Sequence, residues 1–433
     1  MPMHTWMTEL YGLIPPGTGA PGALGINTAF GDRCLHQITI PGTHDAGCYL
    51  SHNTLTSPFS QTQELTIAAQ LMHGIRYFDL RPRYYWSITR WADEWWIHHG
   101  GMVYTGGRIN NGIYAGEEGI LHEIAQFLHD RRNDQELVIL NFSHFYNFTA
   151  ADAHSRFIEL IEDFLWDFLV PHTQAATNIG VTSYAALLTG VTPGRPEGRH
   201  RPASLPNIPV GGYGDEPRSR VLVIYDGALD DDPIPGLTAL PLDVPNRPGF
   251  WVLDPKYPAA VPGGFVYPVG NEMRLFDQYA NSADLETMRS DQLNKLGNRA
   301  GKVFTNRPWS PPARWNNNPP GGVPSTLHLL SWTLTPQSSG GRPINAARNT
   351  TNPALEPLLT QGWSGSARWP LTAVRTYDPQ LDPMINIIYV DVSNSLQYTV
   401  VGQPWTGFDM PVALAMYLNR YIAAVPWNNW GNW

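Results

Sequence analysis

The sequence predicts an α/β fold, a distorted or incomplete (β/α)8 TIM-type barrel, and three observations lead to it. Eight short apolar runs rich in β-branched and aromatic residues have the length of buried strands. Helical patterns separate several of these runs, and such alternation is typical of parallel βα units. The helical patterns are weak between the fifth and seventh runs, so we expect a distorted or incomplete barrel rather than a regular one.

The elements of this barrel can be placed along the chain. The predicted strands are Gln37–Pro41, Ile75–Leu80, Trp95–His98, Leu137–Phe142, Val221–Tyr225, Met273–Phe276, Leu327–Trp332 and Ile385–Val390. The predicted helices are Glu64–His73, Glu118–Asp130, Asp152–Leu169, Asp284–Leu296 and Met410–Tyr421. In the third helix, apolar residues recur every three or four positions and Asp152 is placed to cap the start, so one face should be buried.

A single domain over residues 1–433 is favoured over two. The chain is long enough for one large barrel or for two ordinary domains. Its 39 prolines, 40 glycines and only 15% charged residues indicate a loop-rich globular protein. Segments 192–218, 231–248 and 307–324 are rich in proline, glycine and arginine, and they interrupt the strand series without dividing it. We therefore expect one catalytic barrel with long loop excursions.

Composition excludes several partners. A net charge of −9 argues against nucleic acid and against binding to an anionic membrane by bulk charge. We find no apolar run long enough to span a membrane and no signal peptide at the start, so we expect a cytoplasmic protein or a mature, processed form. Cys34 and Cys48 flank a predicted strand of roughly 20 Å, which favours free thiols.

Polar residues stand where the predicted strands end. His44 and Asp45 follow the first strand, Asp79 and Arg81 close the second, His99 follows the third, and Asp391 closes the eighth. Active sites of such barrels lie at the carboxyl ends of the strands. Residues two apart on a strand point the same way, so Asp79 and Arg81 can face the barrel mouth together, as can Asp277 and Tyr279. Two imidazoles able to hold opposite protonation states beside a fixed cation suit phosphoryl transfer to a neighbouring hydroxyl.

Six motifs in order resemble a known family. They are PGTHDAG at 41–47, GIRYFDLRP at 74–82, IHHG at 97–100, ELVILNFSH at 136–144, FDQY at 276–279 and IIYVD at 387–391. Together they resemble the catalytic domain of phosphatidylinositol-specific phospholipase C in its single-domain bacterial form. The motifs run from the first predicted strand to the eighth, and the ordered set carries the resemblance rather than any one motif.

The resemblance implies a role for each residue of this set. His44 would be the general base for the inositol 2-hydroxyl, oriented by Asp391, while Arg81 would stabilise charge on the phosphoryl oxygens. His99, with Asp45 as its partner, would protonate the departing oxygen, giving diacylglycerol and inositol 1,2-cyclic phosphate. Such intramolecular attack can reach effective molarities of roughly 10⁵ M. His99 is chosen because the family has a histidine directly before glycine, and His98 is expected to be packed.

Arg81 bears on whether a metal takes part. In calcium-dependent members its position resembles an acidic ligand, and Ser143 stands where a further ligand is a glutamate. An arginine can supply the positive charge of the ion. Metal-free catalysis is therefore the favoured expectation. Asp45 and Asp79 are the oxygen ligands if Ca²⁺ is bound.

Headgroup recognition departs from the bacterial pattern, which has an arginine at the end of strand five where this chain has Asp226. Tyr279 would stack under the inositol ring. Asp277 and Asp226 would accept hydrogen bonds from its hydroxyls, and Ser143 is also expected to bind the substrate. Asp226 would repel additional ring phosphates. Unphosphorylated phosphatidylinositol is therefore the expected substrate.

Aromatic segments 84–96 and 427–433 suit either a membrane interface or ordinary packing. The resemblance implies a secreted mature enzyme that contacts membranes only peripherally, and we expect a monomer.

Two other functions remain open. One is a metal-dependent phosphodiesterase of the glycerophosphodiester or sphingomyelinase D kind on the same barrel, which predicts chelator sensitivity and acidic ligands where Arg81 stands. The other is a non-catalytic lipid-binding barrel. The presence of both histidines, Arg81 and Asp391 argues against it, because a binding module has no use for a proton relay.

Overall fold

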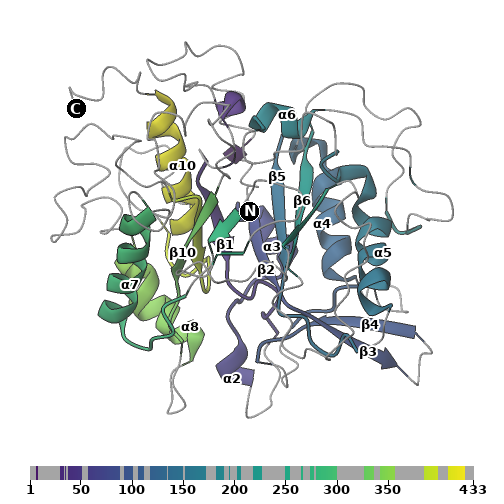
Figure 1. Ribbon diagram of the computed structural model, residues 1–433, viewed down its shortest axis with the longest axis horizontal. Helices are drawn as coiled ribbons and strands as arrows, with labels where there is room; N and C mark the ends of the chain where they lie inside the picture. Colours follow the sequence, from purple (N-terminus) through teal and green to yellow (C-terminus); the bar gives the residue numbers. More distant parts are fainter. Residues whose placement is uncertain are drawn as a thin grey trace.

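A computed structural model gives the structure of the protein (Figure 1). It describes residues 6–7, 30–33, 35, 38–50, 57–87, 92–100, 106–111, 118–133, 135–149, 152–171, 182–189, 195, 202–205, 218–226, 249–253, 265–266, 274–276, 279–299, 326–335, 342–355, 385–397 and 408–424. Within these ranges, the helices are all too short or too polar to cross a membrane.

One nine-stranded sheet forms the centre of the molecule. Its order is β7-β6-β5-β2-β1-β11-β10-β9-β8, and every neighbouring pair is parallel except β8 with β9. The strands are β1 Ile40–Thr43, β2 Tyr77–Leu80, β5 Leu137–Phe142, β6 Arg220–Asp226, β7 Phe250–Leu253, β8 Phe265–Val266, β9 Arg274–Phe276, β10 Thr326–Trp332 and β11 Ile387–Val390. Among the described residues no ladder joins β7 to β8, so the barrel is not closed. The predicted α/β fold with an incomplete barrel is confirmed.

The third predicted strand does not belong to this sheet. Its first three residues fall in β4 (Ala92–Ile97), which forms a separate antiparallel hairpin with β3 (Pro82–Ser87). Only Arg81 separates β2 from β3, so the chain leaves the sheet without the long crossover that a parallel neighbour requires. In Figure 1 the hairpin projects from the lower right of the molecule. The strand that takes its place in the parallel series is β7, which the sequence patterns did not predict.

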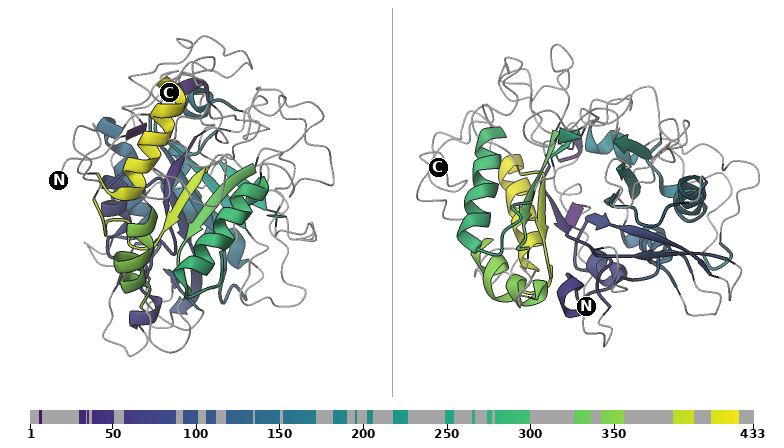
Figure 2. Two further views of the ribbon diagram at one scale, coloured as in Figure 1. Left: turned by 90° about the vertical axis from the view of Figure 1, so that its left-hand side faces the viewer. Right: turned by 60° about the horizontal axis from the view of Figure 1, so that its bottom comes forward.

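Helices flank the sheet at opposite sides of the molecule (Figure 2). They are α2 Ser57–Ser60, α3 Ile67–Met72, α4 Ile120–His129, α5 Ala153–Leu165, α6 Tyr184–Leu188, α7 Leu285–Arg299, α8 Pro343–Ala346 and α10 Met410–Ala424. Helices α7, α8 and α10 lie at one side, and α4 and α5 lie at the other. Helix α10 packs against β1 and β11, and α7 packs against β10. The central strands β1, β2, β5 and β11 are therefore buried along their whole length, as parallel strands covered on both faces usually are.

The sequence predicts a cap at the start of α5 and free thiols at the two cysteines. Asp152 stands at the N-cap of α5, but its side chain makes no capping hydrogen bond and pairs with Arg156 instead, at 3.1 Å. Cys48 is buried and Cys34 lies outside the described residues, so the expectation of free thiols stays a prediction. The single-domain expectation stays a prediction.

Candidate active site

The sheet register brings four strand ends together. Thr43 at the end of β1 lies opposite Val390 of β11 and Phe78 of β2, and Leu80 of β2 lies opposite Phe142 of β5. Because these strands are parallel, the residues that follow them meet at one edge of the sheet. This places His44, Asp391, Arg81 and Ser143 beside one another. The sequence analysis put the first three at this edge of the sheet and did not place Ser143.

His44 is held by the carboxylate of Asp391. Its Nδ1 lies 2.8 Å from Asp391 Oδ1, and since a carboxylate only accepts, His44 Nδ1 carries the hydrogen. Its Nε2 is thereby left to exchange a proton. Asp391 is buried, whereas the His44 side chain is 18% exposed, so the imidazole can be reached from outside.

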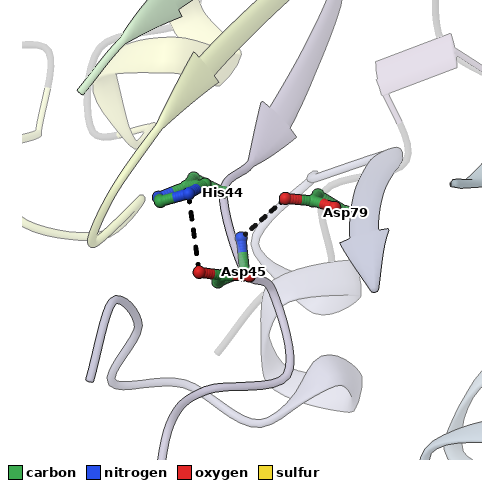
Figure 3. A group of neighbouring side chains, drawn as sticks. All are labelled: His44, Asp45 and Asp79. Carbon is green, nitrogen blue, oxygen red and sulfur yellow. Dashed lines mark hydrogen bonds and ion pairs between the residues drawn. The ribbon is translucent and has the colours of Figure 1, made fainter. Parts of the chain in front are cut away.

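Asp45 contacts three cationic or titratable groups at once. Its Oδ1 lies 2.6 Å from Arg81 Nε, and its Oδ2 lies 3.5 Å from His44 Nε2 and 3.3 Å from His99 Nε2. Figure 3 shows the Asp45 carboxylate turned toward His44, with its backbone nitrogen facing Asp79. Asp45 has a backbone φ of +42°, a left-handed conformation rare for residues other than glycine. The carboxylate is therefore shared by both histidines rather than paired with His99 alone.

His99 is anchored through its other ring nitrogen. Nδ1 lies 3.2 Å from the carbonyl oxygen of Ser60, which can only accept, so the exchangeable proton of His99 belongs on Nε2. The two imidazole rings are 5.9 Å apart between centroids. His98 is buried and bonds the carbonyl of His144 at 2.7 Å, which confirms that it is the packed histidine of the pair.

Arg81 lies between two carboxylates. Besides the contact with Asp45, its Nη2 donates to Asp79 Oδ2 at 3.1 Å. Asp79 also accepts hydrogen bonds from Ser143 Oγ, at 3.3 Å, and from the hydroxyl of Tyr389. The Asp79 carboxylate therefore fixes the position of the Arg81 guanidinium.

This arrangement does not fit a calcium ion. His44, Asp45 and Asp79 each have a ligand atom within 4.8 Å of the others, which is the spacing of a metal site. However, the Arg81 guanidinium contacts both carboxylates, so it already neutralises the oxygens that a hard cation would need and would repel the cation. Ser143 offers a hydroxyl where the calcium-dependent pattern has a carboxylate.

The two histidines have opposite pKa shifts. Burial would lower the pKa of His44, but the charges of Asp45 and Asp391 outweigh it and raise the value from 6.5 to about 9. Burial lowers the pKa of His99, and Asp45 compensates only in part because Arg81 and His44 are close. Burial would raise the pKa of Asp79, yet Arg81, His44 and Tyr389 hold it below its usual range. In the free protein at neutral pH, the proton of the pair therefore resides on His44.

Tyr389 is a site residue that the sequence analysis missed. It stands two residues before Asp391 on β11, so strand alternation directs both side chains to the same face. Its ring lies 5.3 Å from that of His44 between centroids, and its hydroxyl donates to Asp79. This alternation was the signal that could have identified it.

The predicted headgroup residues are only partly described. Asp277 lies outside the described residues, and Asp226 ends β6 with an undescribed side chain. Tyr279 is 58% exposed, and its carbonyl accepts a hydrogen bond from Lys295. Their roles, and that of the buried Ser143 in binding substrate, stay predictions. Segment 84–96 contains both buried Trp95 and half-exposed Trp86, and segment 427–433 lies outside the described residues.

Comparison with known proteins shows which proteins the chain resembles. No protein-family model matches the sequence. The 1-phosphatidylinositol phosphodiesterase of Listeria monocytogenes is 34% identical over 111 residues, which are 24% of this chain and 28% of that protein. The PI-PLC X domain-containing protein 1 of Homo sapiens is 29% identical over 170 residues, which are 34% of this chain and 48% of that protein. The chain is therefore similar in sequence to proteins of the phosphatidylinositol-specific phospholipase C X-domain family.

This similarity covers only part of each sequence, since the matches span less than half of either relative. The fold extends further. A structure of the phosphatidylinositol-specific phospholipase C of Staphylococcus aureus matches 90% of this chain and 94% of its own, with a TM-score of 0.50 and 12% identity. At that identity, the likeness supports the incomplete barrel alone.

Proposed function

We propose that this protein cleaves phosphatidylinositol into diacylglycerol and inositol 1,2-cyclic phosphate. One observation carries the proposal: both histidines are anchored through Nδ1 and turn Nε2 toward the same carboxylate oxygen of Asp45. Two reactive nitrogens are thus held apart at one site, beside a fixed guanidinium. That is the arrangement needed to remove one proton and deliver another across a phosphorus atom.

In the proposed reaction, each of these residues has one role. Nε2 of His44 takes the proton of the inositol 2-hydroxyl, and the freed oxygen attacks the adjacent phosphorus. The bond from phosphorus to the diacylglycerol oxygen breaks, and Nε2 of His99 gives that oxygen a proton. Arg81 stabilises the negative charge that builds on the phosphoryl oxygens. Asp391 holds the His44 imidazole and stabilises its protonated form.

Substrate binding must move the proton from His44 to His99. The forward reaction needs His44 neutral and His99 protonated, whereas the free protein favours the opposite state. A phosphodiester bound beside His99 adds a negative charge, which favours the protonated form of that ring. Release of a proton from His44 and uptake by His99 then prepares the reactive state.

The proposed reaction is independent of metal, because Arg81 supplies the positive charge at the phosphoryl group. The proposed substrate is unphosphorylated phosphatidylinositol at a membrane interface, contacted peripherally. This specificity depends on Asp226 and Asp277 and on the ring of Tyr279, whose roles remain predictions. Secretion and a monomeric state also remain predictions.

Phosphorus NMR of the products tests the proposal. Wild-type protein, incubated with phosphatidylinositol vesicles, should give a cyclic phosphodiester signal, and a chelator should leave its rate unchanged. His44→Ala and His99→Ala should each lower the rate by about 10²-fold or more while keeping the far-UV circular dichroism of the wild type. Near wild-type turnover in either variant would refute the two-histidine mechanism, and chelator inhibition would refute metal independence.

A further inference from the structure

Segment 60–63, which begins at the end of α2, contacts the backbone on both sides of the candidate site. The Ser60 carbonyl accepts from His99 Nδ1. Thr62 Oγ1 donates to the carbonyl of Asp45 at 2.9 Å, and the Thr62 carbonyl accepts from the backbone nitrogen of Val392 at 2.9 Å. One short segment thus joins the loop after β1 to the loop after β11.

The side chain of Gln63 makes the most direct connection within this segment. It is 1% exposed. Its amide nitrogen donates to the carbonyl of His44 at 3.0 Å and to that of Val390 at 3.2 Å, and its oxygen accepts from Ser393 N at 3.3 Å. A single carboxamide therefore ties the backbone of His44 to positions before and after Asp391.

The backbone after β11 needs such support. The last ladder pair is Thr43 with Val390, so regular strand pairing ends just before His44 and Asp391. Val392 then has a φ of +45°, a strained conformation for a β-branched residue. Strained backbone persists only where its surroundings hold it, and Thr62, Gln63 and Asn352 all bond this loop.

We propose that Gln63 is a positioning residue, whose carboxamide holds His44 and Asp391 at the separation that their imidazole–carboxylate hydrogen bond requires. Its effect on rate rests on the proposed phospholipase function, whereas its effect on that hydrogen bond does not. Loss of the carboxamide would remove the bonds to the His44 carbonyl and the Ser393 nitrogen, whereas the Val390 carbonyl would still accept from the backbone nitrogen of His44, and the two loops would shift to satisfy the groups left without a partner. A displacement of about 1 Å can cost 10²-fold in rate.

The test compares Gln63→Met with a matched control, Gln70→Met. Gln70 is also a buried glutamine in this region, but it bonds Thr43, Ala46 and Leu65 and neither His44 nor the loop after β11. Gln63→Met should lower kcat by about 10²-fold with KM unchanged, as expected for a loss of alignment. It should also broaden or shift upfield the low-field proton resonance of His44 Nδ1–H in the substrate-free protein. Gln70→Met should retain the wild-type resonance and kcat.

The proposal fails if Gln63→Met keeps both the resonance and kcat, or if Gln70→Met loses them equally. Should Gln63→Met not fold, Gln63→Asn serves instead, because it keeps a buried amide that is too short to span both carbonyls. If the wild type fails to cleave phosphatidylinositol, the proposed function is wrong. The resonance comparison then still decides the role of Gln63.

Discussion

The two ends of the central sheet both bury charge, but they arrange it differently. At the amino end, Arg76 and Glu136 form an ion pair of 2.8 Å, and neither side chain is exposed. Arg76 directs a further nitrogen to the carbonyls of Leu71 and Ile75. At the carboxyl end, Asp45 is shared among Arg81, His44 and His99.

The difference separates charges that stabilise the fold from charges that the proposed reaction would use. A buried pair with fixed partners resists any change of protonation, because either charge alone would be stranded in an apolar interior. Because Asp45 is shared, a proton can move between His44 and His99 and the protonated ring still lies beside a carboxylate. The partial exposure of Arg81, His44 and His99, at 17%, 18% and 24%, also lets a substrate reach them. Residues at the amino end should therefore determine stability, and residues at the carboxyl end activity.

Arg81→Lys should give the largest effect at the carboxyl end. The planar guanidinium can contact Asp45, Asp79 and a phosphoryl group together, whereas a lysine ammonium cannot. We therefore expect kcat/KM to fall by about 10³-fold. The unfolding midpoint in urea should change little. Arg83→Lys is the matched control, since Arg83 lies on β3 and stacks on Tyr85 and Tyr146. Equal losses of activity in both variants would contradict the special position of Arg81.

How far the sequence predicted this site depends on the range of the interactions involved. Residues at strand ends, such as His44, Arg81 and Asp391, could be predicted because strand patterns are local and parallel strands place their ends together. The β3–β4 hairpin that precedes His99 could not be predicted, because a strand pattern does not show which sheet the strand joins. Gln63 could not be predicted either, since its role consists of bonds to backbone atoms whose positions depend on the complete fold.

Arg76→Met should show the opposite result at the amino end. The substitution leaves the Glu136 carboxylate buried without its ion-pair partner. The free energy of unfolding, measured by urea denaturation, should therefore fall by about 3–5 kcal/mol. The double variant Arg76→Met/Glu136→Leu should recover much of this loss, because no buried charge remains. The folded fraction of either variant should keep the wild-type kcat on phosphatidylinositol. A tenfold fall in kcat would mean that the two ends are not separable.

Asp391→Asn should have the smallest effect, and it tests which group limits the pH profile. Because the reactive state holds one proton, kcat/KM should fall in acid as both histidines become protonated, and again above about pH 9, where His44 deprotonates in the wild type. Removing the Asp391 charge lowers the pKa of His44, so the alkaline limb should move to lower pH. The maximum should fall by between about 10- and 100-fold through loss of orientation. An alkaline limb that stays near pH 9 in this variant would assign it to a group other than His44.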